Sequence, residues 1–169
     1  MAELGDPSMS VSESTADELF TTLSRFHRLL RWGFRTAQQE GDPGPAAQMT
    51  LLFLRRQGPS RAKELALWLG IDKAPASRLV ADLEAKGLLR RETDPDDARS
   101  QRLSLTEDGV ELALQLRARR VEVVRSSLTG LDDATVHATV AAMEELMTTI
   151  QQNLSGDDDR TPPSRALRG

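Results

Sequence analysis

Residues 70–109 read GIDKAPASRLVADLEAKGLLRRETDPDDARSQRLSLTEDG, and this segment carries the strongest indications of the fold class. Asp72 can cap a helix that runs to about Lys86. The runs 88–93 and 102–106 have the composition and alternation of short β-strands. Because the residues between these runs are polar and turn-forming, we expect the two strands to form a hairpin.

A second short helix precedes this stretch. Ser60 can cap the run RAKELALWLG, which stops at Gly70, where glycine favours a left-handed helix end. The small Ala66, four residues earlier, lets the next helix cross closely. Two short helices joined by a tight turn and followed by a hairpin predict a winged helix-turn-helix.

Longer amphipathic helices flank this unit. A capping box at Ser14 or Thr15 can open the first of them, and Thr106 can cap the one after the hairpin. The expected flanking helices run over about 14–39, 45–58, 107–128 and 132–154. The predicted fold class is therefore mainly α with a small β-wing, in which N- and C-terminal helices form a dimerisation region.

The same pattern suggests a division of the chain into five parts. We expect a disordered tail over 1–13, a dimerisation helix within 14–45, a winged helix-turn-helix lobe over 46–105, two dimerisation helices over 106–154 and a disordered tail over 155–169. The N-terminus lacks the features of a signal peptide, and no apolar run is long enough to span a bilayer. Cysteine is absent, which suits the reducing cytoplasm and excludes disulfides.

Charge distribution is more informative than net charge. The net charge of −4 by itself argues against nucleic acid as a partner. Residues 55–102, however, hold 11 Lys+Arg against 8 Asp+Glu, so the acidic excess lies in the flanks. This modest basic balance permits DNA binding without requiring it.

The helix after Asp72 has two distinct faces. Four residues fall on one side and should be buried, namely Ala76, Leu79, Val80 and Leu83. The outward side is narrow, small and polar, as a major-groove helix requires, and comprises Lys73, Ala74, Ser77, Arg78 and Ala81. Arg78 can donate to guanine or phosphate, Ser77 to a base edge or phosphate, and Ala74 can contact a thymine methyl. A solvated helix face explains the same pattern.

The hairpin supplies further cations. Arg99 is a candidate for insertion into a minor groove, with Asp97 bracing it across the turn. Other basic residues can meet phosphates, namely Arg55, Arg56, Arg61, Lys63, Arg90, Arg91 and Arg102. The alternative is a solvated loop with ordinary surface charges.

Residues 70–109 resemble the MarR family of bacterial regulators, in the SRLVADLEAKGLLRR helix end, the DPDDAR wing and the LSLTEDG return. The resemblance extends over about 14–155. It implies a winged-helix homodimer that binds palindromic operators, with Ser77 and Arg78 on the recognition helix and Arg99 at the wing tip, supported by Asp97. Ala74 and Pro75 depart from the small hydroxyl residues that the family often has there.

The resemblance also implies a small aromatic or anionic effector between the dimer helices and the DNA-binding lobe. The candidate residues are His27, Arg31, Trp32, Met49 and Phe53. The alternative is that these are core residues and a helix-surface arginine. No cofactor or metal is expected, since the chain has only two histidines and no cysteine.

Apolar surface supports the homodimer. The first and the last two helices carry more of it than the small lobe can cover, although an intramolecular core could absorb part. We therefore expect double-stranded DNA and a second copy of the chain as partners, no membrane, and a role as a repressor. A winged-helix module that binds protein is the alternative. An enzyme is not expected, because no nucleophile elbow, P-loop, dinucleotide fingerprint or HExxH is present.

Overall fold

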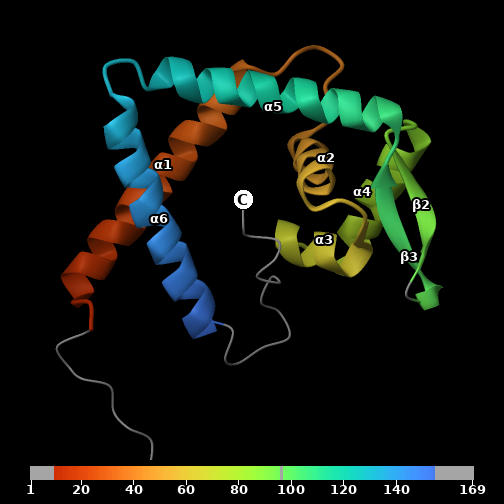
Figure 1. The fold of residues 1–169 in the computed structure, drawn as a ribbon, viewed down its shortest axis with the longest axis horizontal. Helices are drawn as coiled ribbons and strands as arrows, with labels where there is room; N and C mark the ends of the chain where they lie inside the picture. The colour runs from red at the N-terminus through yellow and green to blue at the C-terminus, as the bar shows by residue number, and fades with distance from the viewer. Residues whose placement is uncertain (1–9, 96, 155–169) are drawn as a thin grey trace, which may run out of the picture. The chain divides into compact units, whose positions relative to one another are not determined.

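The structure is a computed structural model, and it describes residues 10–95 and 97–154, without the side chains of Ala98, Arg99 and Leu154. The elements in chain order are α1 (Glu13–Thr36), α2 (Pro45–Gln57), β1 (Ser60–Arg61), α3 (Ala62–Leu69), α4 (Lys73–Ala85), β2 (Leu89–Asp94), β3 (Asp97–Leu105), α5 (Glu107–Ser127) and α6 (Asp133–Leu154) (Figure 1). The chain divides into two units, one ending at Gln38 and one beginning at Gln39. The predicted tails lie mostly outside the described residues.

The first unit is the helix α1. Its cap is Ser12, whose hydroxyl accepts a hydrogen bond from the Thr15 backbone N–H at 3.2 Å. The expected cap at Ser14 or Thr15 is wrong, because the helix starts at Glu13 and the Ser12 hydroxyl already caps the Thr15 N–H in its first turn. Much of the apolar surface of α1 is exposed, for example at Phe20 and Trp32.

The core of the second unit is formed by helices α2, α3, α4 and α5 together with the sheet. Leu51, Leu65, Val80, Leu83 and Leu103 are at most 1% exposed, so α2, α3, α4 and β3 each contribute to one cluster. Burial of these side chains is the main stabilising term for a domain of this size. The core therefore fixes the back of α4 and the inner face of the sheet.

The sheet has the strand order β1-β3-β2, and both pairings are antiparallel. Strand β3 begins at Asp97, so residues expected in a long polar turn belong to the strand. Ser60 pairs with Leu103 and does not cap α3; the N-cap is Arg61, whose N–H is bound by the Glu64 carboxylate at 2.8 Å. The expected cap at Ser60 is wrong because Ser60 pairs with Leu103 of β3, a strand remote in sequence.

The junction of the hairpin with α5 is tightly packed. The Thr106 hydroxyl accepts from the Gly109 N–H, as expected for the cap, and donates to the Gly87 carbonyl at the end of α4. A Cβ on Gly109 would lie 2.0 Å from the Leu88 carbonyl oxygen, so only glycine fits there. This close approach fixes where the hairpin leaves the core.

Figure 1 shows β2 and β3 extending away from α5 as a hairpin at the edge of the second unit. Helix α6 begins after Asp132, whose carboxylate accepts from the Thr135 N–H at 2.8 Å, and this confirms the expected opening of that helix. In the part of the chain that the structure describes, no helix has both the length and the apolar character to cross a bilayer.

Candidate nucleic-acid interface

A tight turn sets α3 against α4. Gly70 ends α3 in the left-handed conformation, at φ 65° and ψ 34°, and its N–H bonds back to the carbonyls of Ala66 and Leu67. The Ile71 N–H also reaches the Ala66 carbonyl. These bonds satisfy the last carbonyls of α3, and α4 starts within three residues. The expected helix-turn-helix is confirmed.

Helix α4 presents the two faces that its sequence predicts. Ala76, Val80 and Leu83 are buried and Leu79 is half-buried. The residues of the other side are all exposed, namely Lys73, Ala74, Ser77, Arg78 and Ala81. The α4 outer face, as we call these five residues, combines small side chains with two cations.

Polar side chains on the α4 outer face are not engaged within the unit. No hydrogen bond or ion pair joins the side chain of Lys73, Ser77 or Arg78 to another residue of the described chain. Their donors are therefore available to an outside partner without first breaking an internal contact.

The sheet also has two unlike faces. Leu89 and Leu103 turn into the core, whereas alternate positions turn the other way. The outward positions form what we call the charged face, made of Arg61, Arg90, Glu92, Asp94, Arg102 and Ser104. Strand pairing places Arg61 opposite Arg102, and Arg90 opposite Ser104.

Asp94 organises the far end of the charged face. Its side chain has no exposed surface, and its carboxylate accepts from Arg61 Nε at 2.7 Å and lies 3.1 Å from Arg102 Nη2. The hydrogen bond to Asp94 raises the pKa of the Arg61 guanidinium above its ordinary value. Two cations are thereby held on one buried anion.

Two further ion pairs brace the hairpin. Arg90 Nε donates to Glu92 at 2.6 Å, and the Ser104 hydroxyl donates to the other oxygen of Glu92 at 2.7 Å. The bonds from Ser104 and Arg90 lower the pKa of the Glu92 carboxyl. On the core side, Arg91 Nε donates to Glu84 of α4 at 3.0 Å. The wing is thus tied to itself and to α4.

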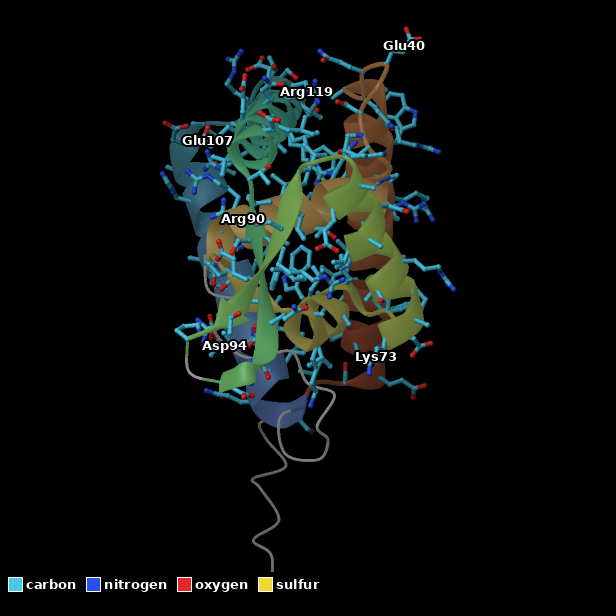
Figure 2. All side chains as sticks on the ribbon, turned by 90° about the vertical axis from the view of Figure 1, so that its right-hand side faces the viewer. Glu40, Lys73, Arg90, Asp94, Glu107 and Arg119 are labelled. Atoms are coloured by element: carbon cyan, nitrogen blue, oxygen red, sulfur yellow. The ribbon has the colours of Figure 1, made fainter. Side chains whose placement is uncertain are left out.

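The wing-tip pair predicted from the sequence is described only in part. Asp97 accepts a hydrogen bond from the Ser100 hydroxyl at 2.6 Å. The side chain of Arg99 lies outside the described residues, so its bracing by Asp97 stays a prediction. Figure 2 shows Asp94 and Lys73 at the same end of the unit, opposite Arg119 of α5. The end of the hairpin and the start of α4 therefore face a common side.

The expected effector residues belong to both units. His27, Arg31 and Trp32 lie on α1, and Met49 and Phe53 on α2. Phe53 is buried in the core, with its ring centroid 5.0 Å from that of Trp68. Met49 Sδ lies 2.9 Å from Nη1 of Arg120, a half-buried arginine whose pKa is lowered by desolvation. Their role as an effector site stays a prediction.

Sequence reasoning missed Asp94. The signal available was the alternation of Arg90, Glu92 and Asp94 along one face of a strand. Nothing local showed that Asp94 alone of these would be buried, because its partners come from β1 and β3. No group of three or more His, Asp or Glu side chains that could hold a metal ion occurs within residues 10–95 and 97–154.

The second unit is a winged helix-turn-helix. A MarR family model matches residues 44–100. A curated relative, the uncharacterized HTH-type transcriptional regulator YxaD of Bacillus subtilis, is 36% identical over 88 residues, which are 50% of this chain and 62% of the relative, so the match spans less than two thirds of that protein.

Solved structures agree with this fold. A MarR family protein from Bacillus stearothermophilus has a TM-score of 0.74 at 20% identity, covering 83% of this chain and 99% of its own. Bordetella bronchiseptica BpsR, described with a mechanism for regulation of its DNA binding by 6-hydroxynicotinic acid, has a TM-score of 0.65 at 24% identity, covering 77% and 98%. The match to the MarR family model is thus confined to residues 44–100, and the likeness to these solved structures is one of fold.

Proposed function

We propose that this protein is a DNA-binding transcriptional repressor that binds a palindromic operator as a homodimer in the cytoplasm and is released by a small aromatic or anionic effector. One observation carries the proposal. The start of α4, at Lys73, and the end of the hairpin, at Asp94, lie at one end of the second unit, and the polar side chains of the α4 outer face have no partner in the described chain. A duplex needs both elements, one for base edges in a groove and one for the backbone.

The DNA contacts in this proposal divide by chemistry. Arg78 and Ser77 read base edges in the major groove, Ala74 contacts a thymine methyl, and Lys73 meets a phosphate near the start of α4. The remaining contacts come from Arg61 on β1 and from Arg90, Arg99 and Arg102 on the wing, with Asp97 as support for Arg99.

The homodimer is proposed from exposed apolar surface. Large hydrophobic side chains are 39% or more exposed on three helices, for example Phe20 and Trp32 on α1, Val121 on α5, and Val140 and Ile150 on α6. Such surface is unusual on a monomer and typical of an interface. A two-fold dimer would place two α4 helices about 34 Å apart, in successive major grooves.

The effector is proposed at the five residues His27, Arg31, Trp32, Met49 and Phe53. BpsR, whose DNA binding is regulated by 6-hydroxynicotinic acid, is a precedent in a protein of this fold. The burial of Phe53 in the core favours a contribution through packing over direct contact. Release of the DNA complex by aromatic acids is the measurement that tests this part.

The central experiment is fluorescence anisotropy with a labelled duplex from immediately upstream of the protein's own gene, with footprinting to locate the site. We expect a protected palindrome and affinity that falls steeply with salt. Arg117→Ala is the matched control for arginine variants, because Arg117 is exposed on α5. If the protein binds neither this duplex nor fragments from the rest of the genome, it is a protein-binding module instead.

A further inference from the structure

The burial of Asp94 is unusual for a residue on a DNA-facing hairpin. A carboxylate with no exposed surface is costly unless charged donors satisfy it, and here the donors are Arg61 and Arg102. Arg61 comes from β1, 33 residues earlier in the chain. Asp94 therefore joins the start of α3 to the wing.

The geometry of Arg61 is the second observation. Only Nε of its guanidinium bonds to Asp94, and the side chain is still 45% exposed. The two terminal amino groups have no hydrogen-bond partner in the part of the chain that the structure describes. A planar guanidinium fixed through Nε presents these remaining donors in one direction.

We propose that Asp94 is a positioning residue for DNA binding: without contacting the duplex, it holds Arg61 so that its terminal amino groups are presented to a backbone phosphate. This inference rests on the proposed function. A backbone phosphate suits the guanidinium of Arg61 because the position of the phosphate varies little with DNA sequence. It also accepts charge-assisted hydrogen bonds from a guanidinium held in one orientation.

A substitution that removes the charge of Asp94 distinguishes positioning from long-range electrostatics, because the two predict opposite changes in DNA affinity. Asp94→Asn keeps the shape of the side chain and removes one negative charge near the DNA. Long-range attraction alone would then strengthen binding to the upstream duplex. We expect instead that affinity falls about tenfold, the loss typical of one good contact.

A double-mutant cycle shows through which residue Asp94 acts. We expect Arg61→Ala to weaken binding about tenfold, and Asp94→Asn to add little in the Arg61→Ala background. We also expect Arg61→Lys to lose nearly as much as Arg61→Ala, because an ammonium cannot bond Asp94 through Nε and present a fork at once. Because the Arg61 side chain is partly exposed, Arg61→Lys should fold, and it tests the inference even if Asp94→Asn does not fold.

Glu84→Gln is the matched control, since it removes another carboxylate that pairs with a wing arginine, Arg91. It should leave affinity within about twofold of wild type, on the scale of a half-exposed ion pair. Melting temperature and circular dichroism are measured for each variant.

Three results would overturn the inference: additive losses from Asp94→Asn and Arg61→Ala, tighter binding by Asp94→Asn, or wild-type affinity in Arg61→Lys. Failure of the wild-type protein to bind any duplex would instead overturn the proposed function itself.

Discussion

The α4 outer face and the charged face of the wing offer cations in opposite ways. Lys73 and Arg78 on α4 are exposed and unengaged within the described chain, whereas Arg61, Arg90 and Arg102 on the charged face each contact a carboxylate. A side chain without internal partners can adapt to different base edges. A side chain held by an ion pair suits a target whose geometry is constant, such as a phosphate.

In the proposed function, α4 reads the sequence and the charged face supplies affinity. The net charge of −4 does not contradict this proposal, because several of the acidic residues pair with arginines and orient them.

Gly109→Ala should displace the root of the wing. The new Cβ would lie 2.0 Å from the Leu88 carbonyl oxygen, and backbone cannot move aside cheaply. We expect a loss of about 3 kcal/mol in the free energy of unfolding, measured by urea denaturation. Gly44→Ala is the control, because no atom lies within 4 Å of a Cβ there. Equal stability of the two variants would mean that the wing root is not rigidly packed.

Arg78→Ala should remove sequence discrimination. Loss of a bidentate base contact costs about 1–3 kcal/mol, so affinity for the protected site should fall about tenfold or more while affinity for a scrambled duplex changes little. Anisotropy with both duplexes measures the ratio. An equal loss of affinity for both duplexes would mean that Arg78 contacts a phosphate. The contrast between α4 and the wing would then not hold.

Arg90→Ala should weaken binding to every duplex alike. A phosphate contact carries no sequence information, so we expect a loss of a few fold and a salt slope lower by about one. The slope is measured from affinities at several salt concentrations, with Arg117→Ala as control. An unchanged slope would leave Arg90 as a partner of Glu92 only.

Protonation of Glu92 in acid should weaken its interactions with Arg90 and Ser104. The pKa of Glu92 is lowered in the folded state by Ser104 and Arg90, so its stabilising contribution is complete above the unfolded pKa and is lost as pH falls through the folded value. We expect Glu92→Gln to have a slightly lower melting temperature than wild type at neutral pH and the same one in strong acid. A constant difference across the pH range would show that charge on Glu92 is not involved.

Much of the fold could be predicted from the sequence because the signals are local. The buried and exposed sides of α4 follow from helical spacing, Gly70 from the left-handed turn it must take, and the cap at Thr106 from its hydroxyl. The two errors have different causes. Spacing alone does not rank Ser12, Ser14 and Thr15 as caps of α1, whereas Ser60 is lost as a cap because it pairs with Leu103 of β3, which is remote in sequence.

The positions of the helices and the hairpin and the polar side of α4 follow from the order of amino acids, since they depend on residues within a few positions of one another. The burial of Asp94 and the turn of Arg61 Nε toward it arise only once the chain is folded. The physical reason is that burial and pairing of a charge depend on partners brought together by the core, and no local pattern specifies which residue 33 positions away will supply the donor.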